Sequence, residues 1–262
     1  MPSVSNIAIG ANMAAAAATK ARHGMNESIT RLSTGVRAMY GGDAAGHSVG
    51  TLTNAHSKSY AQAARNIEDG ISYAQAGESV LMEVANLGQR LMELGIQEDN
   101  SGLMTAEQIA AIDAEGVLIA DTIASILTNT KFNSVDVVSN GASKSVTVAY
   151  GNLTASTLEV GAGQAVTDVS GNTASTAHDT SATTLLGTVS LALGNIAADL
   201  TVLKSLQGVA AATSANYAAA SARLLDTDFA LETASLTKNA ILNQNLKDQK
   251  DFREIKLVYP KL

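Results

Sequence analysis

Apolar residues recur at alternating intervals of three and four positions in both halves of the chain, a spacing that predicts long amphipathic helices. Because a sustained heptad-like seam is typical of coiled coils, we expect the C-terminal helix to pack along another helix. Its seam is formed by Leu186, Val189, Leu193, Ile196, Leu200 and Leu203.

Three further helices are predicted in the N-terminal half. Thr105 followed by Gln108 predicts a capping box at the start of the third of them. The apolar faces are Met25, Ile29, Leu32 and Val36 in the first helix, Val84, Leu87, Leu91 and Leu94 in the second, and Ile109, Ile112, Gly116, Ile119, Ile123 and Ile126 in the third.

The middle of the chain has a different pattern. Residues 145–150 alternate polar and apolar side chains, Gly151 and Asn152 form a turn signal, and residues 157–160 are again strand-like. This order predicts a β-hairpin. The polar, turn-rich segment 168–180 is expected to be an exposed loop.

Two helical zones far apart in the sequence can bury their seams against each other or against another copy of the chain. The predicted fold is therefore mainly α, with long terminal helices in an antiparallel, coiled-coil-like bundle and a small β-hairpin insert. We expect the glycines inside the helices to permit close packing or a bend, because each costs about 1 kcal/mol relative to Ala. These glycines are Gly24, Gly88, Gly95, Gly116, Gly194 and Gly208.

Composition narrows the classes of function for these 262 residues. The formal charge of −7 argues against a nucleic-acid partner, and the lack of cysteine excludes thiol catalysis and cysteine-ligated metal. No window is expected to reach the roughly 18 apolar residues that span a bilayer, so no membrane partner is predicted. The short alanine-rich run 13–18 does not predict a classical secretory signal.

The search for chemistry yields no catalytic, cofactor or metal site, so the chain is not expected to be an enzyme. The four histidines, His23, His47, His56 and His178, lack metal-ligand spacing and are expected on the surface. The carboxylates of the helices are assigned to solvated faces. The glycine-rich stretch 41–46 predicts a tight turn, after which Asp43 caps the next helix.

Several stretches resemble bacterial flagellins in amino-acid sequence, in order and in spacing. At the front they are SITRLSTGVR (28–37), GDAAG (42–46), RNIEDGISYAQ (65–75), QRLMEL (89–94) and TKFN (130–133). At the back they are ARLLDTDFALETA (222–234) and LTKNAIL (236–242).

The resemblance implies a structural subunit that self-assembles into the flagellar filament for motility. It implies an inner-tube helix at 1–45, rod helices with a β-hairpin and variable insert at 46–182, a C-terminal rod helix at 183–225 and a C-terminal inner-tube segment at 226–262. It also implies an extracellular location, export through the flagellar secretion channel, and the export chaperone and the cap and junction proteins as partners. A hook–filament junction protein and a non-polymerising flagellin paralogue are the alternatives.

Two sets of site residues follow. The resemblance implies that Arg90 and Glu115 contact either the vertebrate innate receptor or another subunit, but Gly88 and Met92 depart from the receptor-binding pattern, and we favour an ion pair for Arg90 within the helix or between subunits. The residues assigned to subunit packing or the bundle seam are Met25, Ile29, Leu32, Val36, Leu91, Leu94, Leu193, Ile196, Leu200 and Leu203.

The tail from residue 245 departs from the family pattern. Eight of the sixteen residues from Lys247 onward are charged, and buried unpaired charge is unfavourable in a packed inner tube. The tail could line a solvated lumen with paired charges, form the end of a specialised variant, or reflect an altered reading frame in the source sequence.

Overall fold

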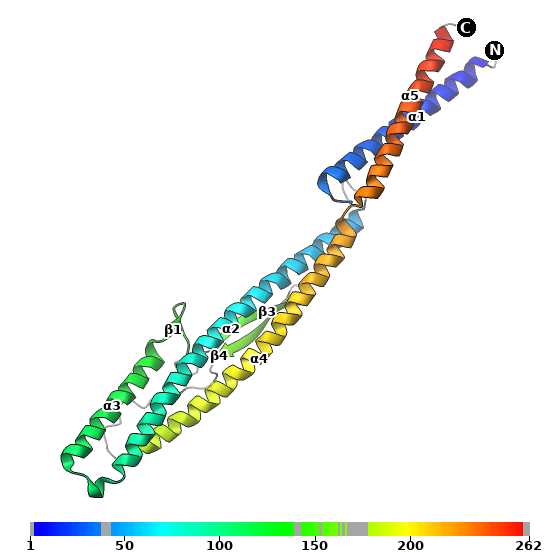
Figure 1. Cartoon of the computed structure of the whole chain (residues 1–262). Coiled ribbons are helices and arrows are strands. Elements are labelled where there is room, and N and C mark those ends of the chain that lie inside the picture. Colours follow the sequence, from blue (N-terminus) through cyan, green and yellow to red (C-terminus); the bar gives the residue numbers. More distant parts are fainter. Residues whose placement is uncertain are drawn as a thin grey trace. The chain divides into compact units, whose positions relative to one another are not determined.

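A computed structural model describes residues 3–37, 43–138, 143–151, 154–161, 163, 166 and 178–258 of the chain. Long helices make up most of these residues, so the prediction of a mainly α fold with a small β insert is confirmed (Figure 1). The elements are α1 (Ser3–Thr34), α2 (Ala44–Glu98), the 3₁₀ turn η1 (Ser101–Leu103), α3 (Ala106–Asn129), β1 (Lys131–Phe132), β2 (Val135–Asp136), β3 (Ser143–Gly151), β4 (Thr154–Gly161), α4 (His178–Leu225) and α5 (Phe229–Val258).

The chain forms two compact units. The terminal unit comprises Met1–Ala55 and Asn216–Leu262, and the central unit comprises His56–Ala215. Helices α2 and α4 contribute to both units, because the boundaries fall inside them. The division at 45, 182 and 225 inferred from the sequence remains a prediction.

The core of the central unit lies where α2 and α4 run antiparallel, with α3 and the β3–β4 hairpin beside them (Figure 1). Along α4 the buried positions keep the predicted alternation of three and four, which places one stripe of the helix in the core. Val189, Ile196, Leu200 and Leu203 are buried, whereas Leu186 and Leu193 flank the stripe and are partly buried. The stripe also includes Ala182, Leu185 and Ala192.

The predicted hairpin is confirmed. Strands β3 and β4 are antiparallel, with Val146 opposite Leu158 and a register shift between Thr147 and Ala149. A Cβ atom on Gly70 would lie 3.0 Å from Val146 Cγ2, so this glycine lets the hairpin approach α2 closely. Asn152, in the predicted turn, lies outside the described residues.

Both predicted helix caps are confirmed. At the start of α3, Gln108 donates its backbone N–H to Thr105 Oγ1 at 3.4 Å, and Thr105 donates its own N–H to Gln108 Oε1 at 2.9 Å. At the start of α2, the backbone N–H of Gly46 donates to Asp43 Oδ1 at 2.8 Å. Each side chain satisfies a backbone donor that the helix itself leaves unpaired. Gly41 and Gly42, in the predicted tight turn, lie outside the described residues.

Two expectations are wrong at the start of α4. The helix begins at His178 and not at Thr183, so residues 178–180 are not part of an exposed loop. His178 is also fully buried, whereas it was expected on the surface. The cause is a close contact in which His178 occupies the space that a side chain at Gly116 would fill. Residues 168–177 lie outside the described part of the chain.

Close packing explains four of the six helix glycines. A Cβ on Gly24 would lie 2.6 Å from Asn239 Nδ2, and one on Gly88 would lie 3.1 Å from Leu185 Cδ2. The corresponding contacts of Gly95 and Gly116 are with the first turn of α4. Around Gly194 and Gly208 no heavy atom lies within 4 Å among the described residues, so those two glycines are not required by packing.

The expectation that no segment reaches the length and apolarity of a membrane span is wrong for one helix. Helix α4 meets that criterion by length and composition, and 28% of its most apolar window is buried in the structure. A core helix of a soluble bundle meets the same criterion, so composition alone is a weak indication of a membrane segment.

Candidate assembly surface

The terminal unit is built around α1 and α5, which lie side by side and antiparallel (Figure 1). Ala14, Ala21 and Ser28 are the buried residues of the described part of α1, and they recur at intervals of seven. Small side chains at this spacing let two helices approach closely along a narrow seam. Gly24 extends the seam at its contact with Asn239.

The exit from α1 is fixed to the link between α4 and α5. Gly35 has a φ of +69°, which ends the helix in the left-handed conformation that glycine adopts most easily. Arg37 then donates its backbone N–H to the Leu225 carbonyl at 2.7 Å, and Thr227 donates its backbone N–H to the Gly35 carbonyl at 3.0 Å. These two bonds place the end of α1 beside the start of α5.

Arg37 also joins three helix ends through its side chain. Its Nη2 atom lies 2.7 Å from Asp43 Oδ2 at the start of α2 and 3.1 Å from the Leu224 carbonyl near the end of α4. The hydrogen bond from the Gly46 N–H, and then the bond from Arg37, lower the pKa of Asp43. Asp43 therefore stays ionised and serves as both helix cap and ion-pair partner.

The apolar side chains of the terminal unit are mostly outside its core. Among its described residues, only Ala14 and Ala21 are buried apolar side chains. Apolar side chains that are exposed in the single chain can be buried against a partner, and this burial is favourable. The large apolar residues left exposed are Ile9, Met13, Ile29, Val49, Leu52, Phe229, Leu231, Ile241 and Leu242, with exposed fractions between 42% and 69%.

The predicted seam residues fall into two groups. Leu91, Leu94, Ile196, Leu200 and Leu203 are buried in the central unit, and Leu193 is partly buried there. In the terminal unit, Met25, Leu32 and Val36 are partly buried, and Ile29 is 50% exposed. Ile29 is therefore not part of a seam within the chain, and a role in packing between subunits remains a prediction.

Arg90 forms ion pairs within the chain. Its Nη2 and Nε atoms lie 2.8 and 3.0 Å from Glu115 Oε1 on α3. Its Nη1 atom lies 3.1 Å from Glu93 Oε2, which is on α2 like Arg90 itself. The hydrogen bonds that Arg90 donates to Glu115 and then to Glu93 raise the pKa of Arg90. The favoured alternative, an ion pair, is thus present, although one partner lies on a second helix. Contact with another subunit or a receptor is untested.

A cluster that sequence reasoning missed brings together Glu98, Asp113 and His178. Burial, and then the charge of Asp113, raise the pKa of Glu98 to about 7. Their donor atoms, one imidazole nitrogen and two carboxylate oxygens, are of the types that bind metal ions. The three positions are far apart in the sequence and form no local motif, so only the tertiary structure reveals the cluster.

The charged tail continues the last helix. Helix α5 runs without interruption from Phe229 to Val258, so the segment that departs from the family pattern is helical as far as it is described. Lys247, Asp248 and Gln249 are exposed on it. Exposed charges at these positions carry little desolvation cost in the single chain.

Known proteins resemble the chain over about half its length. It matches the family model described as the bacterial flagellin N-terminal helical region over residues 5–143. A flagellin from Xenorhabdus nematophila is 37% identical over 139 residues, and one from Escherichia coli strain K12 is 35% identical over 130 residues. These matches cover 53% and 49% of this chain but only 44% and 26% of the two relatives. Since the family model covers more than half of the sequence, the chain belongs to the bacterial flagellin family.

Proposed function

We propose that the chain is a structural subunit that self-assembles into a bacterial flagellar filament. Flagellins are structural proteins and not enzymes, and family membership is the first support for this function. The observation that carries the proposal is the contrast within the terminal unit, where two alanines are buried while large apolar residues such as Met13, Leu231 and Ile241 are exposed.

Physical reasoning connects this surface to assembly. Removing apolar surface from water contributes roughly 25 cal/mol per Å², so copies that cover these faces stabilise one another. Head-to-tail contacts whose rotation does not close generate a helix of subunits and not a ring. The proposed location is the extracellular filament, reached through the flagellar secretion channel. The other proposed partners are the export chaperone and the cap and junction proteins.

The test compares substitutions at Leu231, which is 69% exposed in the single chain. Leu231→Asp is expected to abolish filament growth, because it places a charge in an apolar subunit contact, while the circular dichroism and melting temperature of the monomer stay unchanged. Leu231→Met is the matched control and is expected to assemble like the parent chain. Seeded assembly is followed by electron microscopy and sedimentation.

Two outcomes would contradict the proposal. Persistent monomers of the parent chain under seeding would favour a non-polymerising paralogue, for which the charged tail is the supporting feature. Equal polymer yields from Leu231→Asp and Leu231→Met would show that this face is not the assembly surface.

A further inference from the structure

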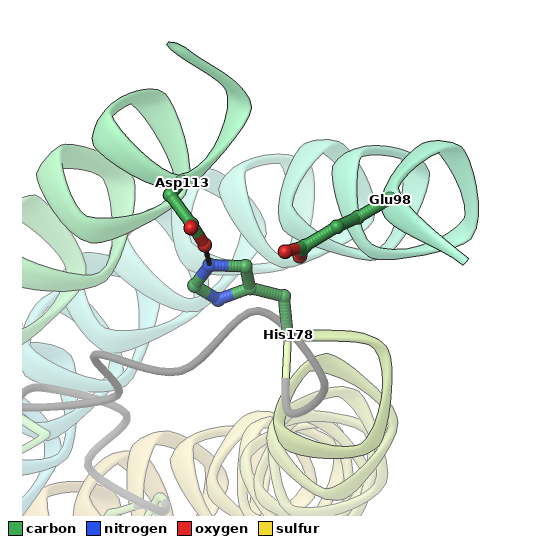
Figure 2. A group of neighbouring side chains, drawn as sticks. All are labelled: Glu98, Asp113 and His178. Carbon is green, nitrogen blue, oxygen red and sulfur yellow. Dashed lines mark ion pairs between the residues drawn. The ribbon is translucent and has the colours of Figure 1, made fainter. Parts of the chain in front are cut away.

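Three helix termini meet at the cluster formed by Glu98, Asp113 and His178. Glu98 is the last residue of α2, Asp113 lies in the second turn of α3, and His178 is the first residue of α4 (Figure 2). His178 is fully buried, Glu98 is 3% exposed, and the Asp113 side chain is 32% exposed. Two ionisable groups are thus almost completely removed from solvent.

The buried polar atoms of the cluster lack hydrogen-bond partners. Among the residues that the structure describes, this holds for both carboxylate oxygens of Glu98, Oδ1 of Asp113, and both ring nitrogens of His178. Asp113 Oδ1 and His178 Nε2 face each other as the 3.5 Å ion pair drawn dashed in Figure 2, without a hydrogen bond between them. Buried polar groups are nearly always paired, since an unpaired one costs the desolvation energy of the group. The side chains point toward one another in Figure 2, so a single ligand between them could satisfy several of these atoms.

The separations suit a small cation. His178 Nε2 lies 3.5 Å from Asp113 Oδ1, and one ligand atom from each of the three residues lies within 4.8 Å of the others. Nitrogen and oxygen ligands bind Zn²⁺ at about 2.0–2.2 Å, so two ligands of a tetrahedral ion lie about 3.4 Å apart. The His178–Asp113 separation already matches this value, and a small movement of Glu98 would complete the set.

The helices leave room for the histidine at the cluster. A Cβ on Gly116 would lie 2.7 Å from His178 Nε2, and one on Gly95 would lie 2.5 Å from the backbone nitrogen of Asp179. Both distances are too short for a side chain, so α2 and α3 each carry a glycine where α4 begins. Gly116 is therefore a positioning residue for His178.

We propose that Glu98, Asp113 and His178 form a binding site for a divalent transition-metal ion of the zinc type. Two carboxylates neutralise the charge of the ion, which reduces the cost of burying all three. The imidazole disfavours Ca²⁺ and Mg²⁺, because those ions prefer all-oxygen ligand sets. Water completes the coordination from the side of Asp113, the most exposed of the three ligands.

The bound ion fastens together the ends of α2, α3 and α4 in the central unit. An ion that binds the folded chain in preference to the unfolded chain raises the melting temperature. This role is independent of filament assembly, so the site can be tested on the monomer.

Zn²⁺ alone is the probe, added to the full chain after chelator treatment. Isothermal titration calorimetry is expected to give one saturable site, and Zn²⁺ is expected to raise the melting temperature. Glu98→Gln and His178→Gln should each weaken binding at least about tenfold, the smallest loss typical of altered metal sites. The matched controls Glu83→Gln and His47→Gln alter exposed side chains of the same types and should bind like the parent chain.

Zinc X-ray absorption on the parent chain tests the ligands without any variant that could misfold. The expected spectrum shows one imidazole with oxygen ligands. The proposal would be overturned by a spectrum without imidazole, by the absence of saturable binding, or by binding that survives both Glu98→Gln and His178→Gln in variants with parent-like circular dichroism.

Discussion

The hydroxyl of Tyr73 donates a hydrogen bond to the backbone carbonyl of Asp136 at 3.0 Å, and so connects the middle of α2 to β2. The Tyr73 ring is 5% exposed and meets Phe132 edge-on at a centroid distance of 6.2 Å. Burial raises the pKa of Tyr73, so the hydroxyl remains protonated and able to donate.

Tyr73→Phe should therefore destabilise the central unit by about 1–2 kcal/mol, because it leaves a carbonyl without its donor while the ring contacts remain. Urea unfolding of the monomer measures the change. An unaltered midpoint in Tyr73→Phe would show that this bond contributes nothing.

Adjacent positions on α4 offer a test of the core. Leu203 is fully buried and Val202 is 43% exposed. Leu203→Ala should lower the free energy of unfolding by about 2–5 kcal/mol, because it removes buried methyl groups and leaves a cavity. Val202→Ala should change it by less than about 0.5 kcal/mol. Similar losses in the two variants would mean that the buried stripe of α4 is misplaced.

Two helix glycines should respond in opposite directions to alanine. Gly95→Ala should destabilise the chain by about 1–3 kcal/mol, since its Cβ would lie 2.5 Å from the backbone nitrogen of Asp179. Gly194→Ala should stabilise it by about 1 kcal/mol, because it gains helix propensity where no described heavy atom lies within 4 Å. Thermal unfolding of the two monomers measures both changes, and equal signs would refute the contrast.

Acid should remove the contribution of Asp43. Its pKa in the folded chain is below the ordinary value of 3.8, so ionised Asp43 stabilises the folded state above that value. This contribution is lost as the pH falls through the lowered folded pKa.

Asp43→Asn should accordingly melt below the parent chain at pH 7, and the gap should close under strong acid. Asp121→Asn, at an exposed position on α3, is the control and should show no such pH-dependent gap. A gap between Asp43→Asn and the parent chain that stays constant from pH 7 to strong acid would show that ionisation of Asp43 is not involved.

Local patterns were sufficient for much of the fold. The period-two alternation at 145–150 identified a strand, the Thr105–Gln108 pair identified a helix start, and the spacing through Ile196, Leu200 and Leu203 identified the buried side of α4. Each of these features can be recognised from a few neighbouring residues, because side-chain direction repeats every 3.6 residues in a helix and every two residues in a strand.

The sequence by itself thus determined the helices, the hairpin and the family, which depend on periodicity and on contiguous motifs. Only the tertiary structure decided which apolar faces remain exposed. Ile29 and Leu203 were both assigned to seams from the sequence, yet Ile29 is half exposed and Leu203 is buried. The tertiary structure also decided the environment of His178. The sequence analysis had expected this histidine on the surface, but it is fully buried. Burial and ligand geometry depend on contacts between segments distant along the chain, and no local pattern contains those contacts.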